Sequence, residues 1–201
     1  MVEILICDDA PQFKSVTAEV ALCWVHAGRH FKKLTPLFAH HRALVEAFLT
    51  DFWAYYQELQ AYRAAPTAAE RARRDAAFDA LFARRTGYWH LDERIAKTAA
   101  TKEALLCVLD HPEVSLHHNP AELGARQRVR TRDVSFGPRS RAGVTAWDIF
   151  GTITQTAAKL GVNVAHYLHD RLSGANRMPS LADLITQRAA EVHTAVALAA
   201  A

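Results

Sequence analysis

Apolar and polar residues follow a helical period through most of the chain. Over residues 41–63, apolar side chains recur at spacings of three and four, which predicts a helix with a wide apolar stripe. Pro66 interrupts this pattern, and Thr67 followed by Glu70 predicts a capping box for the next helix. Helical spacing returns over residues 91–109 and through most of the last third of the chain.

Two short apolar runs near the start predict strands instead. The segment EILIC, residues 3–7, is typical of a strand buried on both faces, and Asp8 and Asp9 follow it directly. Residues 20–26 form a second candidate strand, after which Gly28 opens a short basic helix or turn. The whole pattern predicts an α+β fold that is mostly helical.

Composition limits the cellular setting. The chain has 201 residues, of which half are hydrophobic, and this leaves room for one domain with or without an insertion. Cys7, Cys23 and Cys107 are odd in number and widely spaced, so we expect no disulfide framework and a reducing cytosol. We expect no signal peptide and no membrane span, because no apolar run approaches about 20 residues.

The basic residues are concentrated in one region. From Glu122 to Arg141, six arginines and two acids give 6 − 2 = +4, against +3 for the whole chain. Asn119 can cap a helix whose first turn holds Glu122. Four arginines alternate along this helix: Arg126, Arg128, Arg130 and Arg132. Consecutive members of this set are about 200° apart, so they cannot all share one face, and we expect only some to contact DNA phosphates.

Asp8 and Glu122 are the candidate ligands of a catalytic metal ion. Asp8 follows a predicted strand, at the end where open α/β sheets bind ligands. Mg²⁺ prefers oxygen ligands, and two such ions can clamp the attacking and leaving oxygens of a phosphoryl transfer. Asp9 should point to the opposite side of an extended strand. The alternatives are a plain strand-end turn for Asp8 and favourable placement on the helix dipole for Glu122.

The spacing Cys23-x-x-His26-x-x-x-His30 resembles half of a zinc site. No second pair follows at a suitable spacing, and the pair His117-His118 has no ligand spacing either. We therefore expect Cys23 to belong to a packed apolar strand and not to a metal site.

Several segments together resemble a known family. The acid turn at Asp8 is followed by CWVHAGRHFKKL, NPAELGARQRVRTRDVSFGPRS and TAAKLGVNVAHYLHDRLSG. Over roughly residues 4–174, the chain resembles the carboxyl-terminal part of the DDE transposases of the insertion sequence sixty-six family. The resemblance implies a truncated RNase H-like catalytic domain over residues 1–174, with a helical insertion at about 40–112, and a tail over 175–201.

The resemblance also implies roles for residues. Asp8 would be the second catalytic and metal-binding acid, Glu122 the third, and Asn119 a supporting residue, with Mg²⁺ or Mn²⁺ as cofactor. The four alternating arginines would bind double-stranded DNA at the ends of the element and at the target. The parent protein would be a homo-oligomer in the cytoplasm, associated with the nucleoid.

Two features depart from the family pattern. The first catalytic Asp of the family lies on an earlier strand, whereas Met1 is only a few residues before Asp8. We therefore expect that this chain, purified alone, does not cleave DNA. His118 also stands where the family usually has the first of two asparagines.

Two other functions are compatible with parts of the sequence. The chain could be a transposase remnant that binds DNA or a partner subunit without cutting. Its first residues are also similar to a response-regulator receiver domain, with Asp51 and Lys102 near the positions of a phosphoacceptor and a lysine. The helical pattern around Asp51 argues against the receiver, because a phosphoacceptor should end a strand.

Overall fold

Contacts between elements divide the chain into two compact units, one ending at Asn119 and the other beginning at Pro120. The computed structural model describes residues 3–13 and 15–199, with side chains as far as Glu191. The domain limits expected from the sequence, 1–174 and 175–201, stay a prediction, as does the helical insertion.

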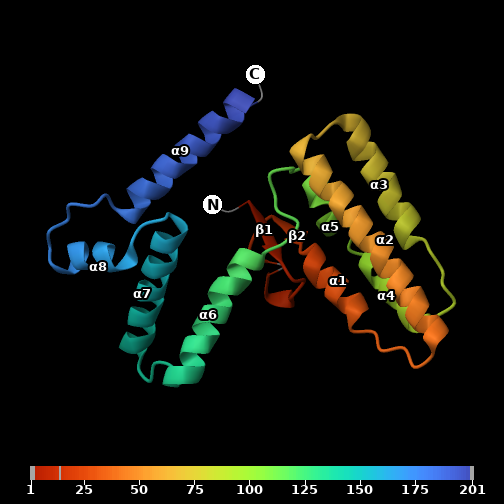
Figure 1. Cartoon of the computed structure of the whole chain (residues 1–201), viewed down its shortest axis with the longest axis horizontal. Coiled ribbons are helices and arrows are strands. Elements are labelled where there is room, and N and C mark those ends of the chain that lie inside the picture. Colours follow the sequence, from red (N-terminus) through yellow and green to blue (C-terminus); the bar gives the residue numbers. More distant parts are fainter. Residues whose placement is uncertain (1–2, 14, 200–201) are drawn as a thin grey trace. The chain divides into compact units, whose positions relative to one another are not determined.

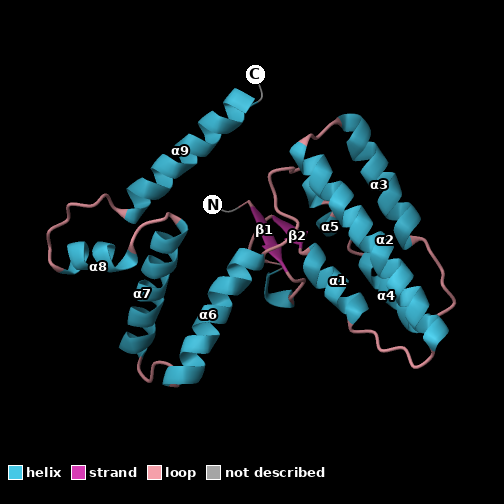
Figure 2. Cartoon of the chain, viewed as in Figure 1, coloured by secondary structure: helices cyan, strands magenta, loops and turns pink. Residues whose placement is uncertain are grey.

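The first unit combines a pair of short strands with a set of helices (Figures 1 and 2). Its elements are β1 (Ile4–Cys7), the 3-10 turn η1 (Pro11–Phe13), β2 (Glu19–Leu22), α1 (Trp24–Lys32), α2 (Ala39–Ala64), α3 (Ala68–Phe82), α4 (Trp89–Ala99), α5 (Lys102–Leu105) and the 3-10 turn η2 (Cys107–Leu109). The strands are parallel, and their register runs from Ile4 opposite Glu19 to Cys7 opposite Leu22. The mostly helical α+β fold is confirmed, whereas the RNase H-like architecture remains an expectation.

The second predicted strand is wrong beyond Leu22. Residues 20–26 were expected to be extended, but β2 ends at Leu22 and α1 begins at Trp24. Trp24, Gly28 and Phe31 are buried, at the i, i+4 and i+7 spacing of a helix. Gly28 therefore lies inside a helix, so the short basic segment expected after it is helical and begins earlier, at Trp24. A short apolar run fits a strand or a buried helix equally well, and here packing against α2 decides for the helix.

Helix α2 provides much of the core of the first unit. Its apolar stripe is confirmed, and Phe52 and Leu59 are fully buried within it. The next helix begins as predicted, since Thr67 accepts a hydrogen bond from the backbone N–H of Glu70 at 3.2 Å. The helix predicted over residues 91–109 is instead broken after α4. There the Thr101 hydroxyl donates to the Thr98 carbonyl at 2.8 Å, and such local bonding competes with helix continuation.

The second unit is helical throughout its described part (Figure 2). Its helices are α6 (Asn119–Ser135), which starts on the last residue of the first unit, α7 (Arg141–Lys159), α8 (Val164–Leu172) and α9 (Leu181–Ala199). Gly161 follows α7 with a φ of 72°, as expected for a glycine that ends a helix. Its described side chains include few buried ones, among them Ala157, Tyr167 and Asp170. None of the helices described in either unit has the length and apolar character needed to cross a membrane.

Candidate active site

The carboxyl ends of the two strands meet at one edge of the sheet. The backbone N–H of Cys23 donates to the Cys7 carbonyl at 2.9 Å, which continues the parallel pairing one residue past β2. Asp8 follows β1 as Cys23 follows β2, so the two residues leave the sheet at the same edge. In sheets of parallel strands, this is the edge where ligands bind.

Both acids of the turn after β1 line the same cavity. Asp9 has a φ of 65°, in the left-handed region, and the Asp8 carboxylate accepts the Ala10 N–H at 3.3 Å. The chain therefore turns at once after the strand, and the extended geometry on which the sequence argument relied does not apply. Both residues are exposed and line one cavity, so the expectation that Asp9 points to the opposite side of an extended strand loses its geometric basis.

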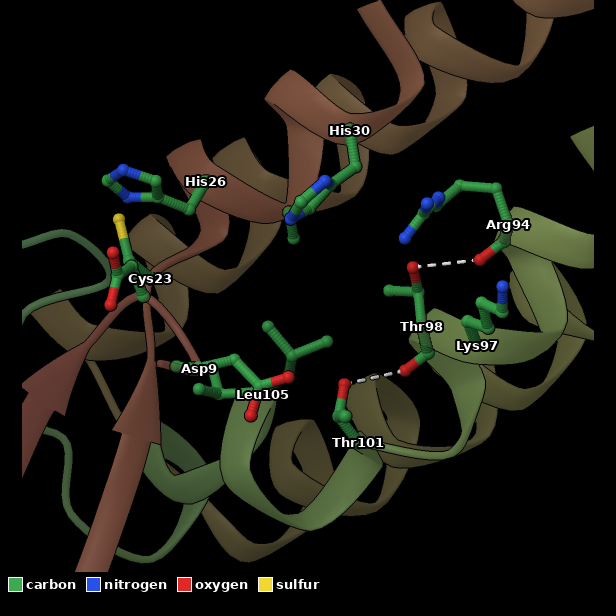
Figure 3. Close-up of a pocket in the computed structure, with 12 residues that line it drawn as sticks. Asp9, Cys23, His26, His30, Arg94, Lys97, Thr98, Thr101 and Leu105 are labelled. Atoms are coloured by element: carbon green, nitrogen blue, oxygen red, sulfur yellow. Dashed lines mark hydrogen bonds between the residues drawn. The ribbon is translucent and has the colours of Figure 1, made fainter. Parts of the chain in front are cut away.

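That cavity is a pocket of about 300 Å³ within the first unit (Figure 3). Its lining comes from the two strand ends and from helices α1, α4 and α5: Asp8, Asp9, Leu22, Cys23, His26, Ala27, His30, Arg94, Lys97, Thr98, Thr101 and Leu105. We call it the strand-end cavity. Acidic residues after β1 and basic residues of α4 therefore line the same cavity.

The pKa of His30 depends on the charges around the strand-end cavity. Burial and the nearby positive charge of Arg94 lower the pKa of His30 from its ordinary value, and Asp9 opposes this shift. Figure 3 shows the His30 ring and the Arg94 guanidinium extending toward one another across the cavity. The lowered pKa of His30 favours its neutral form at neutral pH.

Tight packing holds α1 against the cavity. The Trp24 ring is fully buried, and its indole N–H donates to the Leu105 carbonyl at 2.9 Å. A Cβ added to Gly28 would lie 2.5 Å from the Trp53 ring, so only glycine lets α1 approach α2 this closely. These contacts fix the helix that carries His26 and His30.

His26 also belongs to a second group of side chains at the same end of the sheet. Ligand atoms of Cys23, His26 and His118 all lie within 4.8 Å of one another. Cys23 is buried, as predicted for core packing, but it follows the strand and does not lie within it. His118, for which the sequence indicated no ligand partners, comes from the loop before α6. His30 is not part of this group.

The arginine-rich helix α6 forms the start of the second unit. α6 begins at Asn119 and holds Glu122 in its first turn, as predicted. Arg128 forms an ion pair with Asp148 and lies over the Trp147 ring, 4.9 Å from its centroid. The sharing of one metal ion by Asp8 and Glu122 stays a prediction, as do the supporting role of Asn119 and the DNA contacts of the arginines.

The receiver-like interpretation does not fit this geometry. Asp51 lies within α2 and pairs with Arg84, and the Lys102 ammonium contacts Asp75 and Asp79. Neither side chain lines the strand-end cavity with Asp8.

Sequence reasoning missed the basic side of the cavity. Arg94 and Lys97 lie on the polar face of an amphipathic helix, and the spacing of that helix indicated only which residues are buried. Their approach to Asp8 depends on how α4 packs against α1, which no local pattern reveals.

Comparisons with known proteins identify the family of the chain. Paired acids at parallel strand ends, facing basic side chains, are typical of proteins that bind phosphate groups through a metal ion. The Transposase IS66 family matches residues 3–146, so the chain belongs to that family. It is 35% identical over 187 residues to "Uncharacterized protein y4jO" of Sinorhizobium fredii (strain NBRC 101917 / NGR234), and this covers 92% of the chain and 58% of that protein. The chain thus spans little more than half of this relative's length, and no solved structure matches it significantly.

Proposed function

We propose that the chain is part of the catalytic domain of a DDE transposase, which cleaves DNA at the ends of an insertion element and joins it to a target. One observation carries the proposal: Asp8 and Asp9, at the carboxyl edge of parallel strands, line one cavity together with Arg94 and Lys97. Membership of a transposase family supports the assignment.

The donors at the strand ends suit a hard divalent cation. Asp8 and Asp9 are exposed carboxylates beside a cavity of about 300 Å³, and Mg²⁺ commonly takes one or two carboxylates with substrate phosphates and water. In the proposed site, Asp8 and Glu122 hold Mg²⁺ or Mn²⁺. When bound, such ions stabilise the charge on the attacking and leaving oxygens of a phosphodiester.

Other residues of the chain would position the DNA. Arg94 and Lys97 would bind a backbone phosphate within the cavity, and the lowered pKa of His30 leaves it neutral beside them. The arginines of α6 would contact phosphates farther along the duplex. We infer double-stranded DNA as the partner, a homo-oligomeric parent protein and a cytoplasmic, nucleoid-associated location.

Mn²⁺ binding tests the shared metal site. Electron paramagnetic resonance of the purified chain should show that Asp8→Asn and Glu122→Gln each weaken Mn²⁺ binding by more than about tenfold, because each removes a ligand. Asp133→Asn is the matched control, since Asp133 is an exposed acid farther along the same helix as Glu122.

The result shows whether Asp8 and Glu122 both bind the same metal ion. Equal losses in the Asp8 and Glu122 variants, with the Asp133 variant unchanged, would support one shared site. Binding that Glu122→Gln leaves at the wild-type level would overturn the role of Glu122 as a ligand.

A further inference from the structure

Three side chains from distant segments converge beside the sheet. Cys23 follows β2, His26 lies in the first turn of α1, and His118 precedes α6, yet their ligand atoms lie within 4.8 Å of one another. A backbone hydrogen bond fixes this convergence, because the N–H of Trp24 donates to the carbonyl of Leu116 at 2.9 Å. Leu116 is itself buried, so the loop that carries His118 is anchored to the start of α1.

We propose that Cys23, His26 and His118 form a zinc site. One thiolate and two imidazoles are ligands that Zn²⁺ favours, whereas Mg²⁺ and Mn²⁺ prefer oxygen. Three protein ligands leave the fourth tetrahedral position open to water. The site uses neither Asp8 nor Glu122, so its ligands differ from those of the proposed catalytic metal, although Cys23 and His26 also line the strand-end cavity.

The arrangement needs only a small contraction to hold the ion. Zinc bonds of about 2.0–2.3 Å place tetrahedral ligand atoms about 3.5 Å apart, compared with the present limit of 4.8 Å. The rings of His26 and His118 are stacked, with centroids 4.8 Å apart and planes inclined by 17°. Rotations of the two imidazoles about their side-chain bonds turn their nitrogens toward the Cys23 sulfur. On binding, the Cys23 thiol loses its proton to the solvent and its sulfur forms the bond to zinc.

Arg29 competes with zinc for His26. The Arg29 Nη1 atom lies 2.9 Å from His26 Nε2, and a guanidinium can only donate, so Nε2 is the acceptor. A neutral imidazole has a single acceptor nitrogen, because its other nitrogen carries the proton. His26 therefore cannot bind zinc while it accepts from Arg29. The two states are mutually exclusive, and Arg29 must turn away when the metal binds.

The site would fix the segment that leads into α6. Zinc would tie His118 to the start of α1, which also carries His26 and His30. Because zinc binds the folded chain, it should stabilise the first unit, and above the dissociation constant this stabilisation should grow with the logarithm of the zinc concentration. The expected consequence is a higher melting temperature with zinc than with a chelator.

Zinc titration of the whole chain, in competition with a chromophoric chelator, tests the assignment. Wild type should bind one Zn²⁺ per chain, and His118→Asn should weaken binding by more than about tenfold. The matched control is His117→Asn, which changes the adjacent histidine and should keep wild-type affinity. Arg29→Ala should tighten binding by about fivefold, the value of one hydrogen bond.

Cobalt substitution identifies the sulfur ligand. Co²⁺ bound to wild type should show a thiolate charge-transfer band that Cys23→Ser abolishes and that Cys107→Ser keeps. The Cys23→Ser variant changes a buried residue and could fail to fold. His118→Asn leaves Cys23 unchanged, so it tests the same site without that risk, and its circular dichroism spectrum should match that of the wild type.

Three results would overturn the proposal. They are the absence of stoichiometric zinc binding at micromolar concentrations, equal affinities for His118→Asn and His117→Asn, and a charge-transfer band that persists without Cys23. An Arg29→Ala variant that binds zinc no more tightly than wild type would contradict the assignment of His26.

Discussion

The arginines of α6 should bind DNA from one face of the helix. At about 100° per residue, Arg126 and Arg130 lie one turn apart on one face, whereas Arg128 lies about 200° from Arg126. Arg128 is already neutralised by Asp148 and rests on the Trp147 ring. Within residues 3–13 and 15–199, no ion pair involves Arg126 or Arg130, and both side chains are exposed. The double variant Arg126→Gln, Arg130→Gln therefore removes the two charges best placed for phosphate.

The size of the effect follows from counterion release. Affinity falls as salt rises, and each lost phosphate contact reduces the magnitude of this log–log slope by about 0.9. Two lost contacts should lower the slope by about 1.8. Between about 50 and 200 mM salt, wild-type affinity should then fall about twelvefold more than that of the variant.

Fluorescence anisotropy with a labelled duplex measures these slopes. Arg128→Gln is the matched control and should change the slope by less than one contact, because Asp148 already neutralises that charge. Two results would refute the reasoning: a double variant with the wild-type slope, or an Arg128→Gln slope that falls as far as that of the double variant.

Three further predictions concern the first unit. Gly28→Ala should lower the free energy of unfolding by about 1–3 kcal/mol in urea titrations, because its Cβ would lie 2.5 Å from Trp53; wild-type stability would refute this packing. Folding lowers the pKa of His30, so as the pH falls through about 6.5 the unfolded state binds a proton before the folded state does. The free energy of unfolding therefore decreases as the pH falls below that value. His30→Gln should lose less stability than wild type between about pH 7.5 and 5.5; equal losses would contradict this. Burial raises the pKa of the Cys107 thiol to about 11, so mass spectrometry should show slow alkylation of native Cys107 at neutral pH; alkylation as fast as in urea would contradict its burial.

Local sequence determined much of the helical framework. The apolar stripe of α2, the Thr67 cap and the glycine after α7 each depend on residues within a turn or two, so a short window holds all the relevant information. The strand before Asp8 and the start of α6 were predictable for the same reason. The motifs around Asp8 and Glu122 also indicated the family to which the chain belongs.

Tertiary structure alone decided what surrounds Asp8. The apolar run after β2 suited a strand or a helix, and burial of Trp24 against α2 made it a helix. That choice placed His26 and His30 at the strand ends, and the packing of α4 brought Arg94 opposite the acids. His118 joins Cys23 because the chain returns to the sheet after more than ninety residues, and such long-range contacts depend on the packing of the whole core and not on local spacing.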